Sequence, residues 1–166
     1  MGRDSDAADP QFDSANGILR NLREFTEQAK LDRFERRCSV VALYELELVP
    51  IRGNFDQAHL QAIHRRIFKK VYPWAGELRQ IDIARKASYP FALIPFLQKR
   101  LDQTFAMLAS ENRLRGLAVG QFIERAAFYL GELNSIHPFR EGNGRTLREF
   151  IRELAAEAGL DRKSVV

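Results

Sequence analysis

A stretch of twelve residues near the C-terminus, from His137 to Arg148, holds the side chains best suited to chemistry in this chain. It reads His-Pro-Phe-Arg-Glu-Gly-Asn-Gly-Arg-Thr-Leu-Arg. The two glycines beside Asn143 permit a turn whose successive backbone N–H groups point into one concavity, which is how proteins cradle phosphate. The helix predicted to follow adds the positive end of its dipole. A histidine and a carboxylate next to such a cradle favour phosphoryl or nucleotidyl transfer over passive binding.

The individual residue types agree with that chemistry. His137 has an ordinary pKa of about 6.5, which makes it a usable base near neutral pH. Glu141 is a single carboxylate, and together with phosphate oxygens it suits Mg²⁺, which retains several of its waters. Arg145 and Arg148 fall in the first turn of the predicted helix, where they can neutralise a departing pyrophosphate. The alternative is a structural loop histidine followed by solvated arginines, and the clustering of all these groups argues against it.

Two predicted helices flank the stretch, and each carries apolar residues on a face that can be buried. The preceding helix is apolar over most of its circumference, so we expect it to be the central, buried element. Its apolar residues are Phe122, Ile123, Ala126, Ala127, Leu130 and Leu133. The following helix has the C-cap glycine Gly159. Its apolar residues are Leu147, Phe150, Ile151, Leu154, Ala155 and Ala158.

Three further helices are predicted upstream. The first has an apolar stripe and ends before Pro50. This stripe comprises Leu31, Phe34, Cys38, Val41, Tyr44 and Leu48. The second is capped by Asn54 or Asp56 and ends at Pro73, and its stripe comprises Leu60, Ile63, Ile67, Phe68 and Val71. The third has Pro95 in its first turn and buries Leu97, Leu101, Phe105 and Leu108.

One region departs from the helical pattern. Residues 80–83 alternate in polarity, and residues 91–94 are apolar and short, so this region is expected to form a small β-hairpin or an extended flap. The predicted fold class is therefore all-α with a small β-hairpin flap. Residues 1–14 are polar, acidic and poor in core-forming side chains, and we expect them to be a loose tail.

Composition sets outer bounds on the function. A chain of 166 residues with 45% hydrophobic and 29% charged residues is typical of one globular domain. No run approaches the roughly 18 apolar residues that cross a bilayer, and no secretory leader is visible. The single cysteine, Cys38, suits a reducing compartment such as the cytoplasm. A net charge of +4 is only a weak indication of acidic partners, because acidic and basic residues are interleaved.

The stretch from His137 to Arg148 resembles the motif of the Fic domain family, which is His-x-Phe-x-Asp/Glu-Gly-Asn-Gly-Arg-x-x-Arg, and every position matches. A second stretch, Tyr-Pro-Trp-Ala-Gly-Glu-Leu-Arg at residues 72–79, is similar to a segment that these domains carry upstream. Residues 16–21 resemble the lead-in of small toxin-like members. The resemblance thus assigns residues 15–166 to a Fic domain.

The resemblance implies a mostly α-helical fold and transfer of AMP from ATP to a Ser, Thr or Tyr hydroxyl of a target protein. His137 would be the general base and Glu141 the Mg²⁺ ligand. The anion hole would comprise Gly142, Asn143, Gly144 and Arg145, and Arg148 would meet the γ-phosphate. Phe139 would anchor the loop in the core. The flap, including Ile81, Asp82, Ile83 and Phe91, would dock the backbone of the target by strand addition.

The resemblance also bears on regulation. Many Fic proteins contain an inhibitory Ser/Thr-x-x-x-Glu helix whose Glu pairs with the arginine that corresponds to Arg148. No Ser or Thr in this chain is followed four residues later by Glu. We therefore expect a small antitoxin-like chain to supply that Glu in trans. The protein would act as a toxin in the cytoplasm, or in a host cell if it is an injected effector.

Other functions stay open at this point. The donor could be another nucleotide, or phosphate could be the group transferred. A non-catalytic helical module that binds nucleotide or a protein partner would carry the same anion loop. Direct nucleic-acid binding is not expected, because the chain has no stripe of aromatic and basic residues and no helix-turn-helix signature.

Overall fold

Helices dominate the computed structural model, which describes residues 9–83 and 91–160. Within these residues the helices are α2 (Gln28–Leu48), α3 (Gln57–Phe68), α4 (Ile94–Ser110), α5 (Val119–Ile136) and α6 (Asn143–Glu157). A short 3₁₀ helix, η1 (Asn112–Leu114), follows α4, and two short strands, β1 (Phe12–Asp13) and β2 (Ile18–Leu19), precede α2. The predicted fold class, mostly helical with one small β-hairpin, is confirmed.

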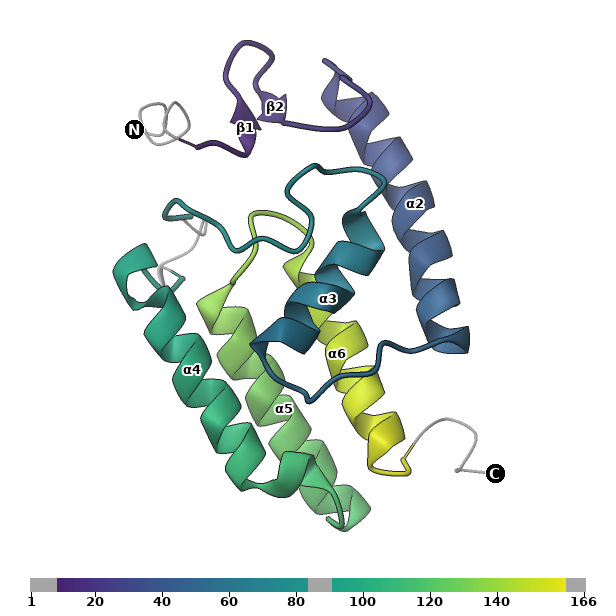
Figure 1. Cartoon of the computed structure of the whole chain (residues 1–166), viewed down its shortest axis with the longest axis vertical. Coiled ribbons are helices and arrows are strands. Elements are labelled where there is room, and N and C mark those ends of the chain that lie inside the picture. The colour runs from purple at the N-terminus through teal and green to yellow at the C-terminus, as the bar shows by residue number, and fades with distance from the viewer. Residues whose placement is uncertain (1–8, 84–90, 161–166) are drawn as a thin grey trace.

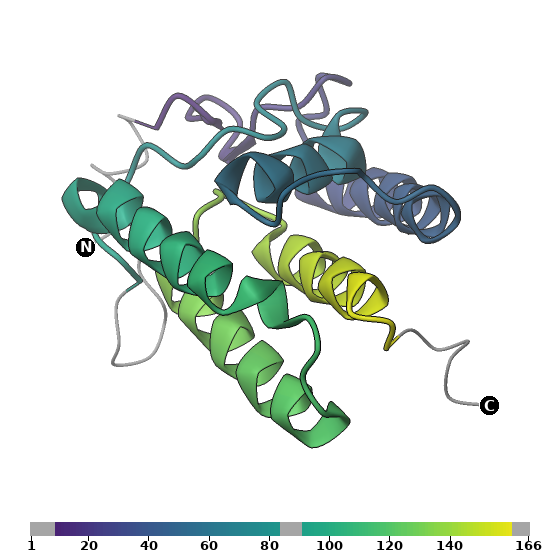
Figure 2. The same cartoon turned by 60° about the horizontal axis from the view of Figure 1, so that its bottom comes forward.

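The order in which the helices pack across the molecule is α2, α3, α6, α5 and α4, which differs from their order in the sequence. Helix α3 lies between α2 and α6, α5 packs on another side of α6, and α4 runs beside α5 (Figures 1 and 2). The expectation that α5 is the central element is therefore wrong. Helix α5 packs on α4 and α6, and Ile123 on its outer face is 61% exposed. Helices α3 and α6 occupy the centre instead. None of the helices in the described part of the chain is long and apolar enough to span a membrane.

Helix α2 is present as predicted, but only the N-terminal part of the predicted stripe packs inward, with Leu31 buried and Phe34 and Cys38 partly buried against the core. The buried residues are Leu31, Ser39, Ala42 and Leu46. Val41, Tyr44 and Leu48 from the predicted stripe are 51%, 63% and 64% exposed. The helix carries two apolar stripes, and the one with the small residues Ser39 and Ala42 faces the rest of the molecule. This leaves an apolar stripe on the outer surface of α2.

Most of the predicted helix boundaries agree with the structure, but α3 ends at Phe68, short of the predicted end at Pro73. Asp56 is the N-cap of α3, where its Oδ1 accepts the backbone N–H of His59 at 2.9 Å. Pro95 lies in the first turn of α4. Gly159 follows the end of α6 with φ +77°, the left-handed conformation of a helix-terminating glycine.

The strand pair lies elsewhere than the flap. Phe12 pairs with Leu19 and Asp13 with Ile18 in antiparallel register. Residues 9–14, which we expected in a loose tail, are thus packed, and the buried carboxylate of Asp9 accepts Nε–H of Arg140 at 2.6 Å. This contact spans most of the chain, and local composition gives no sign of it. Among the described flap residues, 80–83 and 91–93 form no strand, and the predicted tip, residues 84–90, lies outside the described residues.

Candidate active site

The loop between α5 and α6 is shaped by two residues in the left-handed conformation. Helix α5 ends at His137, with φ 53° and ψ 63°, and Pro138 prevents its continuation. Gly142, with φ 82°, then precedes α6. A Cβ atom on Gly142 would lie 2.3 Å from the ring of Phe68 on α3. Glycine is therefore required at position 142 both for backbone conformation and for close approach.

Side-chain contacts brace this loop from within. Asn143 Oδ1 accepts the backbone N–H of Phe139 at 2.9 Å, and Asn143 Nδ2 donates to the Phe139 carbonyl at 2.6 Å. Thr146 Oγ1 donates to the Gly142 carbonyl at 3.0 Å. The Phe139 ring is fully buried. The amide side chain of Asn143 thus holds the loop, and its backbone N–H is the group that can face an anion.

His64 on α3 fixes the loop from outside. Its Nδ1 accepts the backbone N–H of Gly76 at 2.8 Å, so its Nε2–H donates to the Glu141 carbonyl at 3.0 Å. Its ring stacks on Phe139 with the centroids 4.0 Å apart. Burial lowers the pKa of His64 to about 4, which keeps the imidazole neutral and this hydrogen-bond pattern intact. His64 therefore has a structural role in holding the loop.

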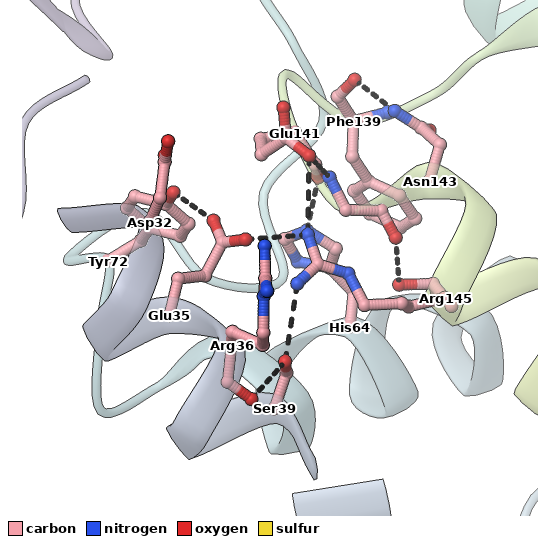
Figure 3. Close-up of polar contacts among 12 residues, drawn as sticks. Asp32, Glu35, Arg36, Ser39, His64, Tyr72, Phe139, Glu141, Asn143 and Arg145 are labelled. Carbon is pink, nitrogen blue, oxygen red and sulfur yellow. Dashed lines mark hydrogen bonds and ion pairs between the residues drawn. The ribbon is translucent and has the colours of Figure 1, made fainter. Parts of the chain in front are cut away.

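Glu141 and Arg145 are linked to α2 through a polar network (Figure 3). Glu141 Oε1 accepts the backbone N–H of Gly142 at 2.8 Å and Arg145 Nη2 at 3.3 Å. The Arg145 guanidinium also contacts Glu35 Oε1 at 2.7 Å and Ser39 Oγ at 3.2 Å, both on α2. The resemblance implies an anion-hole role for Arg145, and in the structure its guanidinium spans the loop and α2.

Tyr72 completes this network from the segment after α3. Its hydroxyl donates a short hydrogen bond to Glu35 Oε2. Burial, and the nearby Glu35 carboxylate, raise the pKa of Tyr72 far above its usual range, so the phenol stays protonated and remains a donor. The sequence did not indicate a role for Glu35, Ser39 or Tyr72 in the site. The only signal was that Tyr72 begins the stretch at residues 72–79.

The start of α6 provides the anion cradle. The backbone N–H groups of Asn143, Gly144 and Arg145 occupy the first turn, where an α-helix offers them no acceptor. Gly144 and Arg148 are both exposed at this end, and a Cβ on Gly144 would lie 3.2 Å from Arg148 Nη1. Arg148 also lines a groove of about 350 Å³ between α2 and α6, together with Tyr44 and Arg152. The start of α6 thus presents backbone N–H donors and the positive charge of Arg148 on the same exposed surface.

The donor set also fits a magnesium ion that bridges to a substrate. The Glu141 side chain is about half exposed and offers hard carboxylate oxygens at the edge of the cradle. In residues 9–83 and 91–160, no group of three or more His, Cys, Asp and Glu side chains is arranged to hold a metal. A site with one protein carboxylate, completed by phosphate oxygens and water, is the kind that Mg²⁺ occupies.

His137 lies beside the flap. Its imidazole is partly exposed and stacks on the ring of Phe91, with the centroids 3.7 Å apart and the planes at 15°. Asp82 Oδ1 accepts the backbone N–H of Ile94 at 2.7 Å, so this flap residue caps the start of α4. Ile81 and Ile83 are partly buried in the same stem. The structure therefore brings Phe91 of the flap next to His137, although 46 positions separate the two residues in the sequence.

Comparisons with known proteins show the family and the fold of the chain. A model of the Fic/DOC family matches residues 54–155, which is more than half of the chain. The chain belongs to the Fic/DOC family. It is 45% identical over 151 residues to the protein adenylyltransferase VbhT of Bartonella schoenbuchensis, covering 91% of this chain and 31% of VbhT. It is 33% identical to the probable protein adenylyltransferase Fic of Escherichia coli, covering 91% of this chain and 74% of that protein.

The fold of this Fic domain also has solved counterparts. The crystal structure of the effector BepC from Bartonella tribocorum, with bound AMPPNP, superposes with a TM-score of 0.81 at 32% identity. The match covers 85% of this chain and 74% of the BepC chain. The chain spans less than a third of the length of VbhT.

Proposed function

We propose that this Fic domain is a protein adenylyltransferase that moves AMP from ATP to a Ser, Thr or Tyr hydroxyl of a target protein. The observation that carries the proposal is the juxtaposition of His137 at the end of α5 with the glycine cradle that opens α6. The adenylyltransferase names of the relatives and the AMPPNP bound to BepC support it.

The residues divide the reaction among them. The His137 imidazole takes the proton of the target hydroxyl, whose oxygen forms a bond to the α-phosphorus of ATP while the bond from that phosphorus to pyrophosphate breaks. The N–H groups of Asn143 and Gly144 face the phosphates, and Arg148 holds the γ-phosphate end. Glu141 would hold Mg²⁺, which when bound neutralises phosphate charge.

The flap is proposed to present the target. Ile81, Asp82 and Ile83 lie in no strand, and apart from the Ile81 carbonyl, which accepts from Arg79, their backbone would pair with a segment of the target. Because Phe91 stacks on His137, a target segment laid along the flap would place its hydroxyl near the imidazole. Main-chain pairing would fix the register of the target and leave its side chain to reach the base.

Inhibition in trans is the proposed control. The exposed apolar stripe on α2 includes Val41, Tyr44 and Leu48, and Tyr44 of this stripe lines the groove that contains Arg148. An amphipathic helix of an antitoxin-like chain could cover this stripe and place a Glu carboxylate on Arg148, which would exclude the γ-phosphate. Positive charge in the groove and apolar surface beside it match such a helix.

Labelled nucleotides test the proposed reaction. The purified domain is incubated with a cell lysate and either α-labelled or γ-labelled ATP, with and without Mg²⁺. We expect a protein band that retains the α label, requires Mg²⁺ and carries no γ label. A γ-labelled band would identify phosphate transfer. ATP binding in calorimetry without any labelled band would instead favour a non-catalytic module, and competition by UTP or GTP reports the donor base.

A further inference from the structure

Arg79, a residue of the segment after α3, is buried at the end of α5. Its Nε donates to the His137 carbonyl at 2.8 Å, and its Nη2 donates to the Ile136 carbonyl at 3.2 Å. The backbone N–H of Arg79 adds a bond to the Pro138 carbonyl at 2.9 Å. The carbonyls at the end of a helix have no intrahelical partner, so Arg79 satisfies this terminus where the chain turns at His137.

The same guanidinium also holds both stems of the flap. Nη1 of Arg79 donates to the Ile81 carbonyl at 2.8 Å, on the stem that enters the flap. Nη2 donates a short hydrogen bond to the Ala92 carbonyl, on the stem that leaves it. The backbone N–H of Ala92 in turn donates to the Ser135 carbonyl at 3.2 Å near the end of α5. A single planar cation therefore joins three chain segments.

The electrostatics explain why a charge is stable in this position. Within the described residues, Arg79 pairs with the carboxylate of Asp82, which lies 3.8 Å from Nη1 and is more than half exposed. The remaining compensation comes from carbonyl oxygens, and those of α5 carry the negative end of the helix dipole. Burial lowers the pKa of Arg79, yet a guanidinium remains charged at any physiological pH.

Lysine cannot replace this arrangement. A guanidinium directs several N–H donors outward in one fixed plane, whereas an ammonium is a point charge on a flexible stem. Carbonyls at positions 81, 92, 136 and 137 surround the fork of Arg79. Arg79→Lys would keep the charge and release at least some of these segments from one another.

We propose that Arg79 is a positioning residue that locks the target-docking flap to the general base. Phe91 lies immediately before Ala92, which Arg79 holds, and the Phe91 ring stacks on the imidazole of His137, whose carbonyl Arg79 also holds. The stack is thus fixed from both sides by one side chain. The catalytic meaning of this coupling rests on the adenylyltransferase proposed above, whereas the coupling itself does not.

Nuclear magnetic resonance of the imidazoles tests the coupling directly. The chain has three histidines, so ¹³C-labelled histidine gives three Cε1–H signals, which single His→Gln variants assign. The Phe91 ring shifts the His137 signal, and Phe91→Leu measures the size of that shift. We expect Arg79→Lys to remove most of it. The matched control is Arg125→Lys, because Arg125 also forms a charged fork, to Glu111 at 2.8 Å, and should leave the shift unchanged.

Activity and binding complete the test. Arg79→Lys should lower kcat for target labelling by about tenfold or more, while its ATP affinity stays within about twofold of wild type, since Arg79 does not face the anion cradle. A wild-type ring shift together with wild-type labelling in Arg79→Lys would overturn the proposal. If the wild type labels nothing while Arg79→Lys still loses the ring shift, the proposed function fails and the coupling stands.

A measurement on the wild-type protein covers the case in which Arg79→Lys does not fold. The Arg79 Nε–H proton, buried and bonded to the His137 carbonyl, should exchange slowly with solvent and show a nuclear Overhauser effect to residue 137. Fast exchange at the rate of a solvated arginine side chain would overturn the proposal without any variant.

Discussion

Arg145 of the motif lies closer to Glu35 on α2, at 2.7 Å, than to Glu141 in its own loop, at 3.3 Å. The guanidinium is therefore shared between two carboxylates on different elements, and Glu35 also accepts the hydroxyl of Tyr72. By drawing Arg145 toward α2, Glu35 limits the hold of Arg145 on Glu141. Glu141 thus remains available for the magnesium that the proposed reaction requires.

Changing Glu35 to glutamine should reveal this competition. Glu35→Gln retains an acceptor for Tyr72 but removes the charge, so Arg145 should pair fully with Glu141. We expect the Mg²⁺ concentration for half-maximal labelling to rise by about tenfold, as a charge-assisted contact of roughly 1.5–3 kcal/mol is redistributed. Glu27→Gln is the matched control, because Glu27 pairs with Lys30 on the exposed surface of the same region. Equal Mg²⁺ dependence in the two variants would contradict this role of Glu35.

Alanine at position 142 should be far more disruptive than at another left-handed glycine. Gly142→Ala combines a left-handed conformation, which costs roughly 1–2 kcal/mol, with a clash against Phe68 at 2.3 Å that adds roughly 1–3 kcal/mol. Gly17→Ala has a similar φ of +71° but no atom within 4 Å of the new Cβ. Urea denaturation should show a larger loss for Gly142→Ala. Equal losses in the free energy of unfolding would mean that the Phe68 ring can move away from the new Cβ at little cost.

Burial of neutral His64 predicts a pH dependence of stability. The pKa of His64 is about 4 in the folded state and about 6.5 for an ordinary histidine, so the unfolded state binds the proton more readily between these two pH values. The contribution of His64 to the free energy of unfolding is therefore complete above pH 6.5. It falls by roughly 3 kcal/mol as the pH is lowered toward 4. Denaturant titrations at pH 7 and pH 4 should show a smaller drop in His64→Phe than in wild type. Identical drops would show that His64 is not the titrating group.

Arg148 should contribute to nucleotide binding more than its neighbour Arg152. Arg148 is exposed at the start of α6 beside Gly144, whereas Arg152 is paired with Glu149 at 2.7 Å. Loss of a charge-assisted phosphate contact predicts ATP affinity about 10–100-fold weaker in Arg148→Ala, measured by calorimetry. Arg152 lines the same groove, and the ATP affinity of Arg152→Ala should stay within about threefold of that of wild type. Comparable losses in both variants would indicate a general charge effect.

Local patterns predicted much of the fold. Asp56 and Pro95 marked the starts of two helices, and Gly159 marked an end, because caps and helix-terminating residues act within a few positions. The glycine cradle could be predicted for the same reason, since Gly142 must be glycine for its own φ. These signals depend on neighbours in the sequence, so they can be recognised in a single amino-acid sequence.

Other features depend on contacts between distant segments. Glu35 and Arg145 are 110 positions apart, and nothing in α2 marks Glu35 among its other acidic residues. The spacing of apolar residues in α2 is compatible with burial of either of two faces. Packing against α3 determines that the face with Ser39 is buried. Asp9 and Arg140 similarly organise the N-terminal segment through a pairing that composition does not reveal. The glycine turn of the loop was therefore predictable, whereas its supporting network was not.

The central claim is that His137 acts as the base while the cradle at the start of α6 holds the nucleotide. The most direct measurement compares wild type and His137→Ala for both α-label transfer and ATP binding by calorimetry. The account predicts that His137→Ala loses at least about 100-fold in transfer rate, as expected for a general base, yet binds ATP within about threefold of wild type. Full transfer by His137→Ala would contradict the account.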